Sequence, residues 1–536
     1  MIAPSTDIIL YKSNLELDNT NQLKFDTWND QWNYFSNLPH IYLDNATYQR
    51  KEGVIRFPTQ DISFDELIRY NYVSYKNEAY ANKTFFAYVK NMRYVNDGMT
   101  EIEIETDVFQ TWQFDIIYRR CFVEREHVNN DSRGAHTIPE GLELGEITMA
   151  AQPTFAFNDP DDYYICFAVS EDPYESLTPF SGMKRQYNGI FGGLYYIFCK
   201  TVDDANNLVS IYDSTGKADA INYIFMIPSA FDLLSSYADW QYPLVGTATY
   251  TSKVYFIDDT QTASLLGGIT CTLPTTLGNG YSPRNNKLLT YPFSYMTLTN
   301  NSGTETVFRY EDFTYDNVNP VPAFAILGAL TPGCSIKACP IVYKNSTGIN
   351  YNYGINFGKL PICSWNSDVY TNWLTQNGIN NAADFLLGTA TAVGSIMQGS
   401  GAGVVGGVKM TYNAVHEEVQ TQIIPNQARG NTNAGDINFS YDYDGGFTVH
   451  YLSVRNEMAR VIDNYFDMYG YKVNRLKVPE IHSRKNWNFV KTIECNFSGD
   501  IPGDDLVKIR QMFDTGITIW HNPSTFLDYS QSNYII

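Results

Sequence analysis

The sequence of 536 residues contains few cysteines for its length. The eight that it has are scattered along the chain, so no disulfide framework is predicted. Cys334 and Cys339 are the only close pair, and no second Cys or His pair stands near them. Two reduced thiols therefore explain this pair better than a zinc site does. We predict that the protein needs no metal and no other cofactor.

The start of the chain lacks the basic residues and the apolar run of a signal peptide. No stretch has the density of Leu, Ile and Phe that is typical of an ordinary membrane-spanning helix. We therefore expect the protein to be made in the cytoplasm.

Sequence motifs of catalysis are also missing. None of the seven histidines occurs in HExxH or another recognised ligand spacing, and there is no G-x-S-x-G elbow. Residues 124–127, which read Glu-Arg-Glu-His and are followed by His136, could suggest a metal or acid/base cluster. A salt-bridged turn is the simpler interpretation, and we adopt it. We predict that the protein is not an enzyme. The alternative is a cell-wall hydrolase that uses carboxylates in 150–340.

Residues 401–406 match the dinucleotide motif G-x-G-x-x-G literally. A dinucleotide site needs a strand before the motif and an acidic residue about 20 positions after it. The preceding stretch is instead rich in Gly, Ala and Ser, and Glu417 and Glu418 follow too soon. The match therefore predicts no nucleotide site.

Positive charge is scarce, because 37 Lys and Arg stand against 58 Asp and Glu, for a formal net charge of −21. Such a surface repels phosphate, which excludes a role in gripping nucleic acid but suits a channel that DNA must pass without sticking. Charged residues make up only 18% of the chain and aromatic residues 15%. Much amphipathic surface must therefore be covered, and contacts between subunits are one place to cover it.

What the chain has in abundance is short segments rich in aromatic and β-branched residues, bounded by Gly, Asn, Asp or Pro. We predict strands in this pattern at 85–95, 101–112, 162–169 and 193–202. Asn96-Asp97-Gly98 predicts a hairpin turn between the first two. Helices are predicted after the capping box that Ser63 opens, at 456–470 and at 504–513. The predicted fold class is mainly β with minor α, in a subunit of several domains.

Composition divides the chain into segments. Residues 1–150 are strand-rich with short helices, and 151–340 form a Thr-, Ser-, Asn- and Tyr-rich β region that resembles an inserted outer module. The expected order is: 1–150, first part of the main domain; 151–340, inserted module; 341–377, return to the main domain; 378–424, an apolar glycine-rich loop; 425–536, an α/β closing part.

The apolar glycine-rich segment 385–408, FLLGTATAVGSIMQGSGAGVVGGV, carries no charge. Its seven glycines each cost a helix about 1 kcal/mol relative to alanine, so roughly 7 kcal/mol weighs against a free-standing helix in water. Its apolar side chains would form a patch if they were exposed, which favours a role at a membrane or in a lumen over a plain surface loop. The apolar residues are Phe385, Leu386, Leu387, Val393, Ile396, Met397, Val404, Val405 and Val408.

Glycines four residues apart in this segment suggest how it could pack. Gly399, Gly403 and Gly407 would share one face of a helix, and small residues at that spacing let helices approach closely in an apolar medium. The same glycines could instead let several copies of the loop crowd into one channel.

Several longer runs resemble the tail knob proteins, or major tail tube proteins, of short-tailed phages of the phi29 type, which infect Gram-positive bacteria. The most diagnostic run is 107–112, DVFQTW, with Asp107, Gln110 and Trp112 as its signature residues. The match weakens in the middle of the chain, between 150 and 340. The other matching runs lie at 93–128, 136–146, 423–439, 469–492 and 499–526.

This resemblance implies a homohexameric, β-barrel-like tube at the distal end of a virion tail, with other tail proteins as neighbours. It also implies that genomic DNA leaves through the tube without specific binding. A long apolar loop from each subunit would plug the lumen and later insert into the host cell membrane, and 378–424 corresponds to that loop here. A passive tube, whose loops seal the lumen and never touch lipid, is the alternative.

One strand could line such a lumen. In 101–105 the residues Glu101, Glu103 and Glu105 alternate with isoleucines, so the three carboxylates share one face. That face is either a lumen-lining acidic surface, repelling DNA over about 10 Å at 0.1 M salt, or an ordinary solvent-facing side of a strand.

Overall fold

The computed structural model describes most of the chain, apart from several short segments and one long one. Those gaps are residues 1–5, 15–16, 47–52, 60–61, 79–80, 151–152, 157–162, 174–185, 188–189, 192–193, 215–219, 230–236, 244–248, 257–262, 279, 330–334, 358–361, 365–430 and 434–445.

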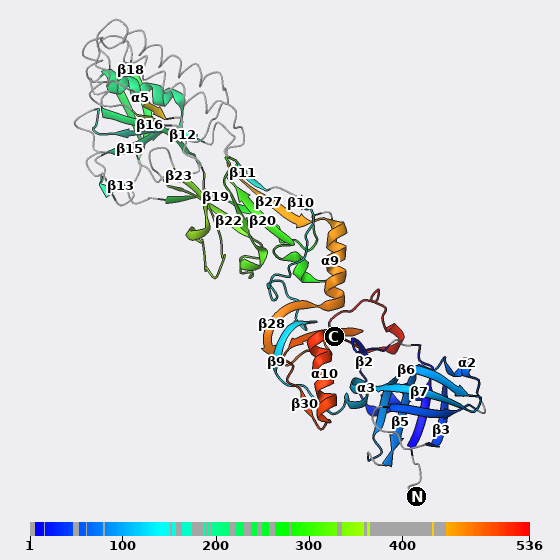
Figure 1. Ribbon diagram of the computed structural model, residues 1–536. Coiled ribbons are helices and arrows are strands. Elements are labelled where there is room, and N and C mark those ends of the chain that lie inside the picture. Colours follow the sequence, from blue (N-terminus) through cyan, green and yellow to red (C-terminus); the bar gives the residue numbers. More distant parts are fainter. Residues whose placement is uncertain are drawn as a thin grey trace. The chain divides into compact units, whose positions relative to one another are not determined.

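The chain forms two compact units, and each is assembled from segments that are distant in sequence (Figure 1). Unit 1 consists of Met1–Glu146, Tyr281–Phe293 and Val454–Ile536. Unit 2 consists of Ile147–Gly280 and Ser294–Ser453. The division into five segments made from composition stays a prediction, since the whole of 378–424 lies outside the described part of the chain.

Unit 1 contains two main sheets. The first is antiparallel, with strand order β3-β1-β5-β6-β7-β4. Its strands are β1 (Thr6–Tyr11), β3 (His40–Ala46), β4 (Gly53–Pro58), β5 (Tyr72–Asn77), β6 (Thr84–Asn96) and β7 (Met99–Thr106). The second has order β2-β31-β29-β9-β28, and a two-stranded ribbon pairs β30 with β8. These strands are β2 (Asn21–Leu23), β8 (Ile116–Ile117), β9 (Cys121–Glu126), β28 (Tyr471–Lys477), β29 (Trp487–Ile493), β30 (Ser498–Gly499) and β31 (Ile517–Trp520).

Two helices of unit 1 illustrate how a side-chain cap begins a helix and a glycine ends one. The Ser63 hydroxyl accepts a hydrogen bond from the Glu66 amide at the start of α2, and Gly470 ends α9 with a positive φ of 64°. The helices predicted after Ser63, at 456–470 and at 504–513 are all present, although the first, α2, already ends at Leu67. The helices are α1 (Trp28–Ser36), α2 (Phe64–Leu67), α3 (Val108–Trp112), α9 (Asn456–Tyr469) and α10 (Gly503–Thr515), with 3-10 turns η4 (Asn286–Leu289) and η7 (Pro523–Thr525).

Unit 2 is built from three larger sheets and a short ribbon of β13 (Gln186–Tyr187) and β14 (Ile190–Phe191). The seven-stranded sheet comprises β17 (Tyr237–Pro243), β18 (Thr249–Phe256), β15 (Tyr195–Cys199), β12 (Tyr163–Val169), β16 (Ile221–Pro228), β25 (Ile362–Ser364) and β26 (Asn431–Asn433), with α5 (Val202–Ser214) against it. The four-stranded sheet comprises β19 (Ala263–Thr270), β22 (Ala323–Ala329), β23 (Ser335–Pro340) and β24 (Ile355–Asn356). The five-stranded sheet comprises β10 (Ile147–Met149), β11 (Thr154–Ala156), β27 (Gly446–Val454), β20 (Ser294–Thr299) and β21 (Glu305–Phe308). Unit 2 also contains the 3-10 turns η5 (Tyr310–Asp312) and η6 (Tyr351–Tyr353).

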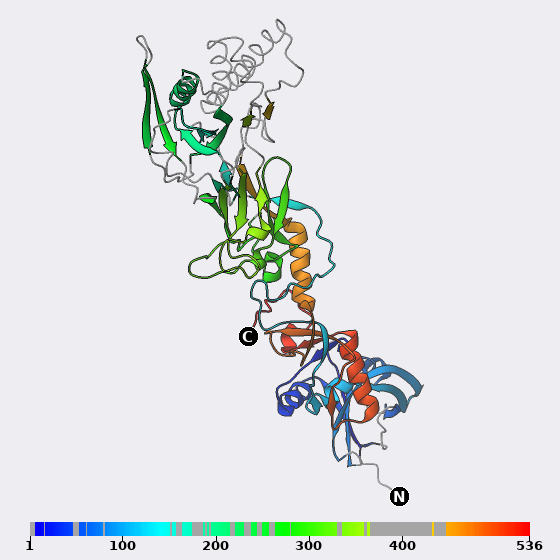
Figure 2. The same ribbon diagram turned by 90° about the vertical axis from the view of Figure 1, so that its left-hand side faces the viewer.

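An aromatic core joins the two ends of the chain within unit 1. Tyr11, Phe35, Tyr72 and Phe86 from the N-terminal segment belong to one buried cluster with tryptophans near the C-terminus, and Trp487 and Trp520 lie 5.0 Å apart between ring centroids. Strand β2 also pairs in parallel with β31, near the other end of the chain. Figures 1 and 2 accordingly show N-terminal strands, in blue, beside C-terminal elements, in red. Neither end forms this core alone.

The predicted mainly β fold with minor α is confirmed. The hairpin at residues 96–98 is also present, with β6 and β7 antiparallel. Two predictions were wrong in part. The strand predicted over 101–112 ends at Thr106, because Asp107 caps the short helix α3 instead. The predicted turn at 124–127 is largely strand β9, which is paired on both sides in the second sheet.

Candidate functional site

The acidic face of β7 has the geometry that the alternation predicts. Ile102 and Ile104 are buried, whereas the carboxylates of Glu101, Glu103 and Glu105 lie on the opposite face. Basic side chains from the neighbouring strands compensate two of these three carboxylates, as the ion pairs below show. Whether this face lines a lumen stays a prediction.

Glu101 lies between two arginines, because the register places Arg56 on one side of it and Arg93 on the other. Its carboxylate pairs with both, with 3.3 Å between Arg56 Nε and Glu101 Oε1. The hydrogen bond from Arg93 lowers the pKa of Glu101. Lys90 Nζ lies 2.6 Å from Glu105 Oε2. The strand therefore presents a nearly balanced array of charges rather than a bare acidic stripe.

The signature residue Asp107 is a buried helix cap. Its carboxylate accepts a hydrogen bond from the Gln110 amide at 3.1 Å, from the Tyr72 hydroxyl at 2.9 Å and from Gln22 Nε2 at 3.2 Å. Burial raises the pKa of this carboxyl. Because three chain segments donate to one carboxylate, Asp107 fixes the end of β7 against β5 and β2.

Gln110 forms the centre of a network of buried amides. Its Nε2 donates to Gln22 Oε1 at 3.0 Å and to the Leu23 carbonyl at 2.5 Å. Its Oε1 accepts from Gln31 Nε2 at 3.0 Å and from Gln113 Nε2 at 2.9 Å. All four hydrogen-bonding positions of the amide are therefore occupied, which only glutamine at this position provides.

Trp112 connects this network to the C-terminal helix. Its indole Nε1 donates to Asp505 Oδ2 in α10 at 2.9 Å. Its ring meets Phe85 edge to face, and Lys83 Nζ lies 4.5 Å above it. The signature run 107–112 therefore acts as a structural junction. Asp107 and Gln110 both bind Gln22 of β2, and Trp112 binds Asp505 of α10.

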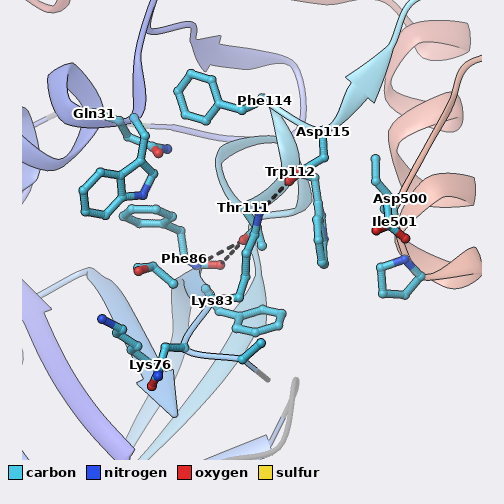
Figure 3. A pocket seen from close by; sticks show the side chains of 16 residues that line it. Gln31, Lys76, Lys83, Phe86, Thr111, Trp112, Phe114, Asp115, Asp500 and Ile501 are labelled. Atoms are coloured by element: carbon cyan, nitrogen blue, oxygen red, sulfur yellow. Dashed lines mark hydrogen bonds and ion pairs between the residues drawn. The ribbon is translucent and has the colours of Figure 1, made fainter. Parts of the chain in front are cut away.

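A cavity of about 800 Å³ opens beside this junction in unit 1. Figure 3 shows Trp112 on its wall, with Asp500 and Ile501 beyond it and Gln31 across from it. Lys83 Nζ pairs with Asp115 Oδ2 at 2.5 Å. The wall is mixed aromatic and polar. The lining residues are Trp28, Gln31, Lys76, Ala81, Asn82, Lys83, Thr84, Phe85, Phe86, Thr111, Trp112, Phe114, Asp115, Asp500, Ile501 and Pro502.

A second buried polar network holds the three segments of unit 1 together. Glu140, with a side chain that is 1% exposed, forms ion pairs with Arg125 and Lys287. Desolvation by burial lowers the pKa of Lys287, against the opposing effect of Glu140. Asp463 in α9 accepts hydrogen bonds from the Arg284 amide at 2.9 Å and the Asn285 amide at 3.1 Å. Residues 281–293 are thereby anchored to both flanking segments.

The residues near 124–136 form ion pairs, not a metal or acid/base cluster. Glu124 pairs with Lys491 and Glu126 with Lys477. His127 is buried, and His136 contacts the Asn130 carbonyl at 2.9 Å. Within the described ranges of the chain, no group of three or more His, Cys, Asp or Glu side chains could hold a metal ion.

The predicted membrane-active residues lie outside the described part of the chain, as the whole of 385–408 does. They are Phe385, Leu386, Leu387, Val393, Ile396, Met397, Gly399, Gly403, Val404, Val405, Gly407 and Val408. No helix among the residues that are described is long and apolar enough to cross a membrane.

Sequence reasoning missed the partners of the signature residues. Gln22, Gln31 and Asp505 lie in polar surroundings in the sequence and carry no motif. Asp505 is 393 positions from the indole that it binds. The one available signal was a polar side chain, Gln110, in an otherwise apolar run, because a buried amide requires partners.

Comparison with known proteins gave matches over nearly the whole chain. The family model for the C-terminal domain of tail knob protein gp9 of Bacillus phage phi29 matches residues 260–534, and the caudoviral major tail protein N-terminus matches residues 4–117. Tail knob protein gp9 of Bacillus phage B103 is 25% identical and that of phage phi29 is 24% identical, each over 94% of both chains. The structure of the tail knob protein gp12 of bacteriophage C1 has a similar fold, with a TM-score of 0.62 at 15% identity over 99% of this chain and 100% of that one.

Proposed function

The chain belongs to the family of tail knob protein gp9 of Bacillus phage phi29, and from this membership we propose that it is a structural subunit of the knob of a phage tail. Its place is the virion tail. The observation that carries the proposal is the match of two tail-protein models to the two ends of the chain, which meet in unit 1. A structural role also agrees with the signature residues, whose polar groups are used in internal hydrogen bonds.

We further propose that the subunits form a homohexameric distal tube, joined to other tail proteins, that conducts the DNA genome. The net charge of −21 supports this part, because an acidic wall does not retain phosphate. Compensation of Glu101 and Glu105 by Arg and Lys means that β7 would repel DNA only weakly if it faced the lumen. The proposed acidic character of the lumen wall then depends on the net charge of the whole chain.

The finer proposal concerns the apolar loop 378–424, which would close the lumen before infection and then penetrate the host cell membrane as a pore. Its support is the sequence: an uncharged apolar run of 24 residues bracketed by Asp384 and Lys409. Transfer of its apolar side chains into lipid would supply about 25 cal/mol for each Å² buried. Its backbone groups would have to be hydrogen-bonded within the inserted assembly.

Deletion of 385–408 tests the pore. We expect the deleted protein to assemble as the full chain does, but to release no dye from liposomes. A variant with the same number of residues replaced by glycine and serine keeps the length of the loop and should also fail to cause leakage. Undiminished leakage from either variant would refute the pore.

The alternative is a passive tail tube whose loops only seal the lumen. It predicts that the full chain neither floats with liposomes nor causes leakage, although it assembles. Flotation of purified protein on a density gradient, with and without mild acid, separates the two functions. Failure of the full chain to assemble at any concentration would count against both.

A further inference from the structure

Two buried cysteines from distant parts of the sequence meet in unit 1. Cys121 is the first residue of β9 and is 3% exposed, and Cys495, two residues after β29, is 7% exposed. Their thiols are in hydrogen-bonding contact. Strands β9 and β29 are neighbours in the second sheet, and α10 packs against β29. The fold therefore places side by side two free thiols that no sequence motif connects.

The two thiols of this pair are not equivalent. The hydrogen bond from Cys121 lowers the pKa of Cys495, and the same bond raises the pKa of Cys121. The sulfur of Cys495 also accepts a hydrogen bond from the Phe497 amide. The thiolate is the form of cysteine that attacks an oxidant. Cys495 is therefore the nucleophile of the pair, and Cys121 is placed to react with it afterwards.

Cys495 lies just beneath the surface of the unit. The residues before and after it, Glu494 and Asn496, are exposed, and the chain turns tightly at Glu494, where φ is +54°. The amide of Cys495 donates to Asp514 Oδ1 of α10 at 3.0 Å, which holds this turn in place. A small oxidant must therefore displace only a surface turn, and not the core of the sheet, to reach the Cys495 thiol.

The Tyr118 hydroxyl is a second observation at the same place. It is buried and has no hydrogen-bond partner among the described residues. Its ring packs edge to face on Phe497, with 5.0 Å between ring centroids. Burial raises the pKa of Tyr118, and a negative charge on Cys495 raises it further, so the hydroxyl and this thiol share one enclosed space. An oxygen atom added to Cys495 would be an acceptor for the donor that lacks one.

Cysteines on neighbouring strands of unit 2 provide a contrast. The register pairs Cys199 with Ile165 and Cys166 with Phe198, so the two cysteines point to opposite faces of their sheet. The Cys199 thiol instead contacts the Ser252 hydroxyl at 3.9 Å. Cys199 is therefore a matched control, because it is buried and near a second cysteine whose thiol it cannot reach.

We propose that Cys121 and Cys495 form a site of reversible oxidation, at which a small peroxide converts the two thiols into a disulfide. The Cys495 thiolate attacks hydrogen peroxide, the O–O bond breaks, and Cys495 becomes a sulfenic acid. The other oxygen leaves as hydroxide, which takes up the proton that the Cys495 thiol released. The Cys121 thiol then attacks the Cys495 sulfur, the S–O bond breaks, and its proton leaves with the oxygen as water. Two thiols and one peroxide thus give one disulfide and two waters.

This modification goes beyond a structural role in the tail, because it gives the subunit two covalent states. Cytoplasmic thiols stay reduced, whereas a virion meets oxidising surroundings outside the cell. The disulfide ties β9 to the turn between β29 and α10, within unit 1 alone. A crosslink between distant segments restricts the unfolded chain, so oxidation stabilises unit 1.

The first test treats the reduced full-length chain, freed of reductant, with a small excess of hydrogen peroxide. Peptide mass mapping without reductant should find Cys121 joined to Cys495, and dithiothreitol should release the two thiols again. The melting temperature of unit 1 should rise by at least about 4 °C on oxidation, and this rise should be absent in Cys495→Ser. A map in which both thiols stay free, or in which Cys495 is joined to another cysteine, would overturn the proposal.

The second test separates the roles of the two thiols. Cys121→Ser removes the thiol that completes the disulfide, so Cys495 should stop at the sulfenic acid, which dimedone labels. Cys495→Ser should leave Cys121 unoxidised, and the control Cys199→Ser should form the disulfide as fast as the unaltered chain. Dimedone labelling of Cys121 in Cys495→Ser, without labelling of Cys495 in Cys121→Ser, would overturn the assignment of the nucleophile. None of these results depends on the tube or the pore, so failure here leaves the proposed function standing.

Discussion

Replacement of Gln110 by alanine tests whether the signature run is a structural junction. The Gln110 side chain is fully buried and occupies four hydrogen-bonding positions. After the change, Gln22 Oε1, the Leu23 carbonyl and Gln113 Nε2 lose the partner that they have here. Gln31 Nε2 keeps the Gln110 carbonyl at 2.8 Å. Three buried polar groups would therefore lose their hydrogen bond to the Gln110 amide.

Each such group costs about 1–3 kcal/mol, and water entering the space recovers part of that cost. We expect the free energy of unfolding of unit 1 to fall by about 4 kcal/mol. Gln110→Met keeps the length of the side chain without its amide, so it separates the hydrogen bonds from the cavity that alanine leaves. It should lose nearly as much stability as alanine does.

The assay is urea denaturation followed by tryptophan fluorescence, which reports mainly on unit 1 because Trp28, Trp32, Trp112, Trp487 and Trp520 lie there. The exposed Gln531→Ala is the control, and its effect should stay within about 0.5 kcal/mol. A loss below about 1 kcal/mol for Gln110→Ala, with an unchanged denaturant slope, would refute the reasoning.

Two further predictions follow from the same unit. Burial lowers the pKa of His127 to about 3, and its Nδ1 accepts a hydrogen bond from the Phe489 amide at 2.7 Å. Below pH 6.5 the histidine therefore binds a proton in the unfolded chain but stays neutral in the native chain. The stability that this histidine contributes is present above pH 6.5 and is lost as the pH falls towards 3, by about 5 kcal/mol, because one pKa unit corresponds to about 1.4 kcal/mol. The difference in unfolding free energy between the unaltered chain and His127→Gln should therefore shrink on acidification, and a constant difference would contradict the shift. Gly470→Ala should destabilise by more than about 2 kcal/mol in thermal or urea unfolding, because φ is +64° and a Cβ would come within 2.1 Å of the Glu126 carbonyl oxygen. Gly280→Ala, at a φ of +81° with open space around it, is the control that isolates backbone strain, and equal losses for the two would remove the clash as the cause.

Local patterns in the sequence were sufficient for several elements. The alternation in 101–105, the hairpin at Asn96-Asp97-Gly98 and the amphipathic run that ends at Gly470 each depend on residues close together in the chain. The same patterns failed at Asp107, where strand and helix compete within a few residues. There the outcome is decided by the carboxylate cap, whose other donors come from distant segments.

The charge of the β7 face shows the limit of reasoning from one strand. The three glutamates share a face because side chains alternate, and this follows from the sequence alone. The compensation of Glu101 by Arg56 and Arg93 follows from the register of two other strands, which no local pattern specifies. An acidic stripe in the sequence thereby becomes a balanced surface in the fold.

Composition and local motifs determined by themselves that this chain is acidic, mainly β and without a recognised catalytic motif, and they identified its family from short runs. Only the tertiary structure decided which residues meet: Trp112 with Asp505, Glu140 with Lys287, and Phe122 with Leu476 and Ile493. The physical reason is that buried hydrogen bonds and strand register are set by partners that are distant in the chain, whereas turns, caps and alternation are set by neighbours.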